Sequence, residues 1–95
     1  MVTHIVLFKL IDPTPENLRQ TVNILMDMKG KIPQIRGIEV GTDQLHLDRS
    51  YDIGLIVRFD SLEDLKIYTD HPVHRKVVEF MNGVRKSSVC VDFTS

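Results

Sequence analysis

The sequence predicts an α+β domain whose four-stranded antiparallel sheet carries both of its helices on one face. Four β-branched and aromatic runs have strand length, and two amphipathic segments at helical spacing lie after the first and third of them. Capping and turn residues stand at the boundaries of these segments. The resulting order, β-α-β-β-α-β, is that of the ferredoxin-like arrangement.

Composition limits the classes to which the chain can belong. The 95 residues amount to one domain, residues 1–95, and 42% hydrophobic with 26% charged residues is the balance of a globular chain. A formal net charge of -1 argues against nucleic acid and anionic membranes as partners. No apolar run approaches the roughly 18 residues of a membrane span, and the N-terminal stretch does not have the pattern of a signal peptide. Cys90 has no second cysteine to pair with, so we expect a cytoplasmic protein.

The first strand is predicted over residues 3–11, and its side chains alternate between two faces. One face holds His4, Val6, Phe8 and Leu10, and the other holds Ile5, Leu7, Lys9 and Ile11. Because both faces are mostly apolar, we expect both sides of this strand to be covered.

The first helix is predicted to begin with Thr14 as its N-cap and Pro15 at its first position. Its apolar stripe recurs at helical spacing, and Gly30 is expected to end the helix after about four turns. Strands are predicted over residues 35–43 and 52–60, joined by a loop over residues 44–51.

The second helical region is predicted to contain a break. Ser61 caps its start, with Asp64 three residues later, and the pair His71 and Pro72 interrupts it. Pro72 can open a fresh helical segment that ends near Gly83. The last strand is predicted over residues 86–93, where we expect the Cys90 thiol to be buried and unreactive.

A ferredoxin-like sheet leaves one face without helices, and in this chain the strand residues of both faces are apolar. A second copy of the same protein is the economical cover for that face, so we predict a homodimer whose sheets pack face to face. The alternative is a monomer that hides the face under its loop and C-terminal tail, but seven or eight loop residues are few for that task.

Several segments resemble the stress-responsive α/β-barrel domain family. They are HIVLFKL from His4, GTD from Gly41, FDSLEDL from Phe59 and above all YTDHPVH from Tyr68 to His74. The resemblance runs essentially the whole length of the chain and implies a dimeric α/β barrel.

The same fold family includes olivetolic acid cyclase of plant polyketide metabolism and, more distantly, the antibiotic-biosynthesis monooxygenases. In that cyclase a tyrosine and a histidine perform acid–base chemistry between sheet and helices, assisted by a histidine of the first strand. The resemblance implies that Tyr68, His74 and His4 are the matching residues. The predicted first helix has no tyrosine where the cyclase has one, which argues against a plant-type polyketide substrate.

The candidate site residues each have a structural alternative. A His4 that lines a pocket with Val6 and Phe8 can exchange a proton near neutral pH, whereas a His4 at a strand end bonds backbone or water. Tyr68 and His74 form the hydroxyl donor and the base of a carbonyl site, or else a core tyrosine and a solvent-facing histidine. His71 is a further candidate ligand contact, although its place before a proline favours a local hydrogen bond that fixes the turn.

Three hypotheses about function follow. The first is a homodimer that binds a small, partly apolar molecule between sheet and helices through Val6, Phe8, Tyr68, His71 and His74. The second is a cofactor-free cyclase, isomerase or lyase acting on an activated carbonyl compound, with His74, Tyr68 and His4 as catalytic groups. The third is a structural, stress-associated protein without catalysis. No metal and no cofactor are expected, since the histidines lack the cysteine or carboxylate partners of a metal site.

Overall fold

The computed structural model describes residues 1–95 and contains a single four-stranded sheet with three helices. The strands are β1 (Val2–Leu10), β2 (Gly37–Thr42), β3 (Ile53–Phe59) and β4 (Arg85–Thr94). The helices are α1 (Pro15–Met26), α2 (Leu62–Asp70) and α3 (Pro72–Val84). The predicted ferredoxin-like order is confirmed, with the second helical region divided at the predicted break.

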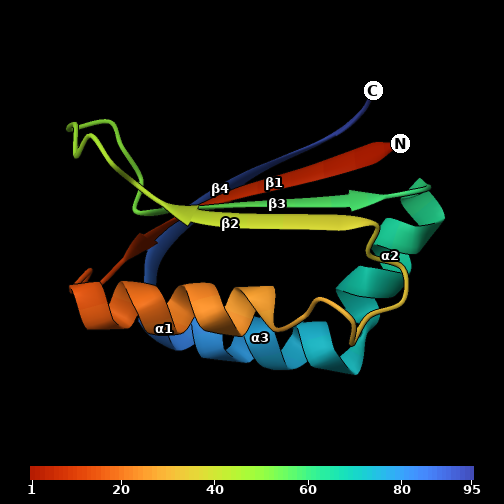
Figure 1. Ribbon diagram of the computed structural model, residues 1–95, viewed down its shortest axis with the longest axis horizontal. Coiled ribbons are helices and arrows are strands. Elements are labelled where there is room, and N and C mark those ends of the chain that lie inside the picture. Colours follow the sequence, from red (N-terminus) through yellow and green to blue (C-terminus); the bar gives the residue numbers. More distant parts are fainter.

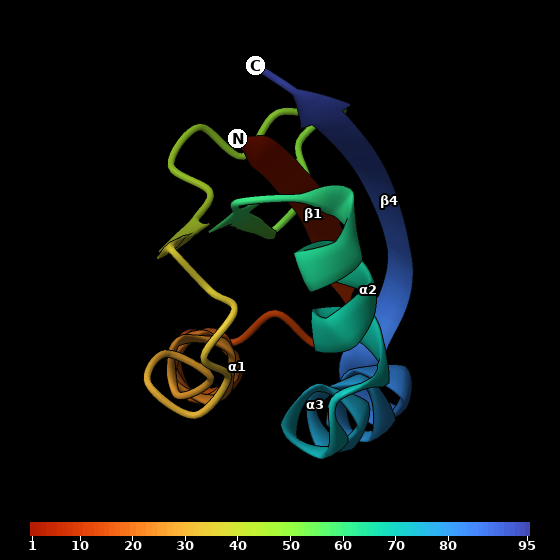
Figure 2. The ribbon, with the colours of Figure 1, turned by 90° about the vertical axis from the view of Figure 1, so that its right-hand side faces the viewer.

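The strands lie in the order β2-β3-β1-β4, and every neighbouring pair is antiparallel. All helices lie against one face of this sheet (Figure 1). Figure 2 shows α1 and α3 below the sheet and α2 leading down to α3. The central strand β1 pairs with β3 on one side and β4 on the other, so Ile5 faces Ile56 and Val91 across the sheet. This register brings the end of the chain beside its beginning.

The core lies between the sheet and the helices. Along β3 the side chains alternate, and Ile53, Leu55, Val57 and Phe59 are buried on the helix side. They pack into one apolar cluster with Leu25 and Met28 from the α1 region, Tyr68 of α2 and Met81 of α3. The face of β3 that carries Gly54, Ile56 and Arg58 receives no helix.

Local hydrogen bonds explain where the helices begin. The Thr14 hydroxyl accepts a hydrogen bond from the Asn17 backbone N–H at 3.2 Å, and the Ser61 hydroxyl accepts one from the Asp64 N–H at 3.1 Å. Both side chains thereby satisfy an N–H group that has no partner within its helix. The predicted caps of α1 and α2 are confirmed.

The predicted end of α1 is wrong. The helix ends at Met26, four residues before Gly30, and turns follow because the Met28 and Lys29 N–H groups bond to Leu25 and Met26 carbonyls. Met28 is buried in the core, so its apolar side chain continues the helical pattern after the helix has ended. Gly30 lies within these turns at φ 82°, a conformation that favours glycine.

The predicted burial of Cys90 is also wrong, because the thiol is exposed. Cys90 pairs in register with Val6 on the outermost strand β4, whose outer edge has no neighbouring strand. A position between two valines in a strand therefore does not determine whether the side chain is covered.

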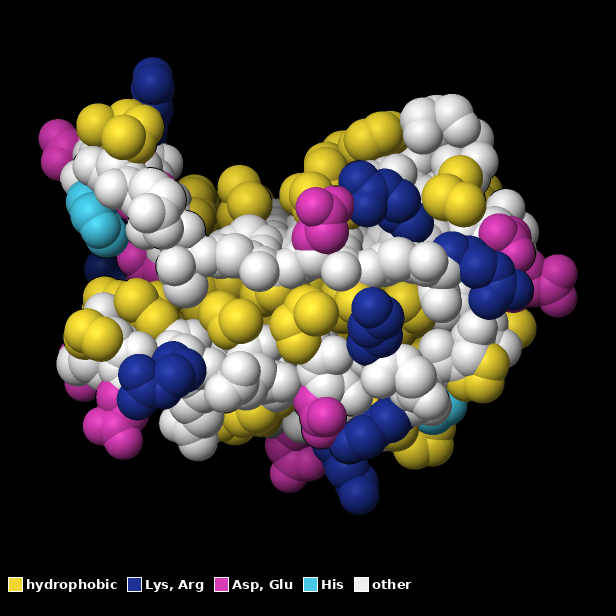
Figure 3. Space-filling model, in the orientation of Figure 1, with side chains coloured by type: hydrophobic (Ala, Val, Ile, Leu, Met, Phe, Trp, Pro, Cys, Tyr) yellow, Lys and Arg dark blue, Asp and Glu magenta, His cyan; other side chains and the backbone are white.

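The face of the sheet without helices is apolar and concave. The loop between β2 and β3 rises at one end of this face and the end of β4 rises at the other (Figure 1). Hydrophobic side chains occupy the hollow between them (Figure 3). We call this surface the open face; its apolar side chains are Ile5, Leu7, Ile56, Val89, Val91 and Phe93.

None of the three helices has the length and apolar content that crossing a bilayer requires.

Candidate functional site

A cavity of about 190 Å³ lies between the sheet and α3. Its walls come from β1, β3 and the start of β4 on the sheet side, and from the α1 region, α2 and α3 on the other. Three of the predicted site residues, His4, Tyr68 and His74, lie together in its wall, and the predicted ligand contacts Val6 and Phe8 also line it. The remaining lining residues are Leu25, Met28, Leu55, Val77, Val78, Met81, Asn82, Arg85 and Ser88.

The break between α2 and α3 brings Tyr68 and His74 together. In a continuous helix, two residues six positions apart would lie about 9 Å apart along the axis and about 120° apart around it. Here His71 has extended backbone (ψ 137°) and Pro72 starts a new helix in another direction. The rings of Tyr68 and His74 consequently pack with their centroids 4.3 Å apart.

His71 holds this bend. Its Nδ1 accepts a hydrogen bond from the Val73 backbone N–H at 3.1 Å, so the imidazole is the N-cap of α3. The structure does not place His71 in the cavity wall with His4, Tyr68 and His74. The expected local hydrogen bond that fixes the turn is present.

His74 is held as a neutral base. Its Nδ1–H donates to the Thr69 carbonyl oxygen at 3.0 Å, which leaves Nε2 without a proton and free to accept one. Burial lowers the pKa of His74 below its usual value, and the nearby His4 and His71 lower it further against the opposing effect of the Thr69 hydrogen bond. The ring is therefore neutral at neutral pH, with its single proton on Nδ1.

Tyr68 supplies a hydroxyl donor. The residue is 1% exposed, and its ring packs against Phe59 at 5.0 Å and against His4 at 6.0 Å between centroids. Burial raises the pKa of Tyr68 well above its usual value, so the hydroxyl keeps its proton. The structure shows no hydrogen bond between this hydroxyl and the rest of the chain, although the residue lines the cavity.

His4 is paired with Asp92. The His4 Nδ1–H donates to the Asp92 Oδ1 across the β1–β4 pair, in which these two residues are register partners. A carboxylate on one ring nitrogen fixes the tautomer and leaves the other nitrogen available. Sequence reasoning missed Asp92; the signal was an acidic residue in the apolar stretch from Val89 to Phe93, on a strand that this topology places beside β1.

A second set of polar residues also went unnoticed in the sequence. Arg85, Asn82 and Ser88 line the same cavity where α3 ends and β4 begins. These three residues follow one another at intervals of three along the last turn of α3 and the first residues of β4, and this spacing was the available signal. Because no loop separates these elements, a residue at the junction can still reach the cavity.

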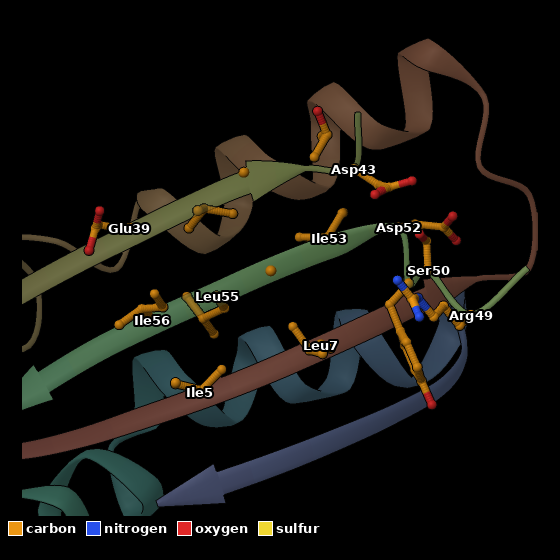
Figure 4. Close-up of a pocket in the computed structure, with 15 residues that line it drawn as sticks. Ile5, Leu7, Glu39, Asp43, Arg49, Ser50, Asp52, Ile53, Leu55 and Ile56 are labelled. Atoms are coloured by element: carbon orange, nitrogen blue, oxygen red, sulfur yellow. The ribbon is translucent and has the colours of Figure 1, made fainter. Parts of the chain in front are cut away.

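The open face bears a larger, shallower hollow of about 670 Å³. Figure 4 shows Ile5, Leu7 and Ile56 on its neighbouring strands, with Arg49 and Asp52 at its edge. No histidine lines it. Nowhere in the structure do three or more histidine, cysteine, aspartate or glutamate side chains gather in a way that would hold a metal ion.

Solved structures show the same fold. A dimeric protein of unknown function and ferredoxin-like fold from Bacteroides fragilis is 35% identical, with a TM-score of 0.81 over 99% of this chain and 95% of the other. A dimeric ferredoxin-like protein of unknown function from Thermobifida fusca is 26% identical, with a TM-score of 0.87 over 99% and 90% of the two chains. Hydroxynitrile lyase from Passiflora edulis is 14% identical, with a TM-score of 0.85 over 97% and 90%, and this likeness is one of fold alone.

No curated protein matches the chain. A family model described as Stress responsive A/B Barrel Domain matches residues 2–95, which is nearly the whole chain. The predicted resemblance is confirmed, and the protein belongs to the stress responsive A/B barrel domain family.

Proposed function

We propose that the protein is a homodimer in which each subunit binds a small, partly apolar molecule in the cavity beside Tyr68 and His74. The observation that carries the binding proposal is the Tyr68 hydroxyl, which has no partner in the chain and belongs to a residue that lines the cavity and is 1% exposed. A ligand that accepts a hydrogen bond from this hydroxyl gains about 0.5–1.5 kcal/mol.

The pairing of two copies rests on the open face. Val89, Val91 and Phe93 are 47%, 52% and 44% exposed, and Leu7 lies beside them on β1. Contiguous exposed apolar surface of this kind marks an interface in a protein that lacks other cover for it. The Bacteroides fragilis and Thermobifida fusca proteins are both described as dimeric, which supports the same assembly here.

Light scattering tests the assembly. The native protein is expected to have twice the chain mass of 10.9 kDa, and Val91→Asp is expected to reduce it to a monomer by placing a charge in the interface. Ile67→Asp is the matched control, because Ile67 is 42% exposed on α2, away from the open face. A native monomer, or equal effects of the two variants, would contradict the proposed dimer.

NMR titration with small ketones tests the binding proposal. A ketone offers an acceptor to the Tyr68 hydroxyl and apolar carbon to Val6, Phe8 and Met81, so we expect shifts of the residues that line the cavity. Tyr68→Phe is expected to weaken binding while leaving the cavity walls intact. Shifts confined to other surfaces in the native protein would contradict the proposal.

Proton transfer without a cofactor is the second candidate function, and the neutral His74 beside the protonated Tyr68 favours it. In such a reaction His74 Nε2 removes a proton from the carbon next to a carbonyl group, while the Tyr68 hydroxyl donates a hydrogen bond to the developing enolate oxygen. The His4–Asp92 pair provides a second imidazole at the same end of the cavity. A cyclase, an isomerase or a lyase that acts through an enolate can begin with this step.

Exchange of carbon-bound hydrogen for deuterium in small ketones, followed by NMR, measures that step directly. We expect His74→Gln to slow the exchange by about 10²-fold or more, the usual contribution of a positioned general base. His46→Gln is the control, because His46 lies in the exposed loop between β2 and β3. Exchange no faster than in buffer would limit the function to binding.

A further inference from the structure

We propose that the molecule bound in the cavity carries a carboxylate, and that Arg85 binds this group at the end of the cavity remote from Tyr68 and His74. The inference deepens the proposed binding function and rests on it. It assigns a role to Arg85, which is the only lysine or arginine side chain in the cavity wall.

Arg85 and the histidine end of the cavity are well separated. His74 and Arg85 are eleven residues apart along α3 and its direct continuation, which corresponds to a rise of about 16 Å. On the sheet, Asp92 pairs with His4 and Ser88 pairs with Phe8, so the two ends differ by four strand residues, or about 13 Å. Two independent elements thus give the cavity two polar ends.

The wall between these ends is apolar. Val6 and Leu55 from the sheet face Val77 and Met81 from α3 across the cavity, and Leu25 and Met28 close it from the α1 region. A molecule that fills this space therefore has an apolar middle. Its polar groups lie at its ends, one toward Tyr68 and His74 and the other toward Arg85.

The guanidinium group of Arg85 has neutral partners. Its Nη1 donates to the Ser88 hydroxyl at 2.9 Å, and its Nε and Nη2 donate to the Asn82 Oδ1 at 3.3 and 3.0 Å. No carboxylate lies within 4.0 Å of it, whereas Arg36 and Arg58 each pair with an acidic side chain at 2.8 Å. A half-buried positive charge without a counter-ion is suited to an anionic ligand.

The shape of the guanidinium group favours a carboxylate among anions. Its planar fork presents parallel N–H donors that match the two oxygens of a carboxylate. The bonds to Asn82 and Ser88 hold the fork in one orientation before a ligand arrives, which reduces the entropy lost on binding.

Two matched probes test the proposal: an oxooctanoate with its ketone on the penultimate carbon, and the primary amide of the same acid. Both offer a ketone to Tyr68 and an apolar chain, and they differ in the charge presented to Arg85. We expect NMR titration of the native protein to give at least roughly tenfold tighter binding of the carboxylate, the ratio that a hydrogen bond to a charged group supplies.

The variants separate recognition from structure. Arg85→Gln is expected to reduce the preference for the carboxylate to about twofold or less while the amide still binds, and Arg85→Lys to retain part of the preference. Lys86→Gln removes the neighbouring exposed charge, which does not line the cavity, and is expected to preserve the full preference. Since Arg85 also caps α3, Ser88→Ala is a second variant that keeps the charge and loosens only its orientation.

The outcomes distinguish this inference from the proposed function. Equal binding of the carboxylate and the amide to the native protein would overturn the role of Arg85 and leave the cavity as a binding site. A preference that Arg85→Gln preserves, or that Lys86→Gln abolishes, would also overturn it. Failure of both probes to shift any cavity residue would overturn the binding function, and the inference with it.

Discussion

Removal of one oxygen atom, by Tyr68→Phe, is expected to stabilise the protein. Tyr68 is 1% exposed, and its hydroxyl has no hydrogen-bond partner in the chain, so folding removes part of the hydration that this donor has in the unfolded state. Protein mutations place the cost of leaving a donor without hydration or a partner at about 1–3 kcal/mol. The hydroxyl borders a cavity that can admit water, which favours the lower end of this range.

The expected gain is therefore about 1 kcal/mol in the free energy of unfolding, which corresponds to a rise of about 4–8 °C in Tm for a domain of this size. Urea unfolding at a fixed protein concentration measures it, since dimerisation makes stability depend on concentration. Tyr51→Phe is the matched control: Tyr51 is half-buried in the loop that ends at β3, beside Lys9, and its change is expected to stay within about 0.5 kcal/mol.

A loss of more than about 1 kcal/mol in Tyr68→Phe would refute this reasoning, because it would mean that the folded chain satisfies the hydroxyl. The same variant is expected to bind ketones more weakly, so stability and binding change in opposite directions. A residue that is retained at a cost in stability is typical of a functional site.

Four further predictions concern the surroundings of the site. Burial lowers the pKa of His74, so as the pH falls the unfolded chain binds a proton near pH 6.5, before the folded chain does. The free energy of unfolding is therefore expected to fall as the pH drops below 6.5. This fall is expected to be smaller in His74→Gln than in the control His46→Gln. Burial raises the pKa of Tyr68, so stability is expected to fall as the pH rises above 10.0, and Tyr68→Phe to remove that part of the loss in alkaline unfolding curves. His71→Ala is expected to lower the free energy of unfolding by about 1 kcal/mol and His71→Asp to restore it, because both His and Asp can accept a hydrogen bond from the Val73 N–H. Thermal melts of the two variants measure this difference. The exposed Cys90 is expected to react with a thiol reagent in the native dimer, because it lies on the opposite face from Val89 and Val91; a thiol that reacts only after unfolding would contradict this.

Local chemistry made most of the fold predictable. Thr14 and Ser61 cap helices because each hydroxyl accepts a hydrogen bond from a backbone N–H within one turn. Pro72 interrupts a helix through its own ring and missing N–H, whatever the tertiary packing around it. Tyr68 and His74, which flank that break, were candidates because the family resemblance implied them. These features depend on residues close in sequence, which the pattern contains.

The misses involve residues that meet through the tertiary fold. Asp92 reaches His4 only because β4 lies beside β1, and the exposure of Cys90 depends on how far the helices extend under the outermost strand. Arg85 stands at the end of a helix, where charged residues usually face solvent, and becomes part of the cavity because β4 begins at once. The apolar pattern continued to Met28, beyond the end of α1 at Met26, because the turns after the helix also bury a side chain in the core. The pattern therefore predicted too long a helix.

The bend at His71 and Pro72 restricts how this chain can vary in length. Insertion of one residue between Tyr68 and Pro72 would rotate the tyrosine by about 100° about the axis of α2 and separate its ring from that of His74. The loop between β2 and β3 carries no such requirement, because neither ring rests on it. Relatives that keep this chemistry should therefore preserve the tyrosine-to-histidine spacing residue for residue, while the loop is free to grow or shrink.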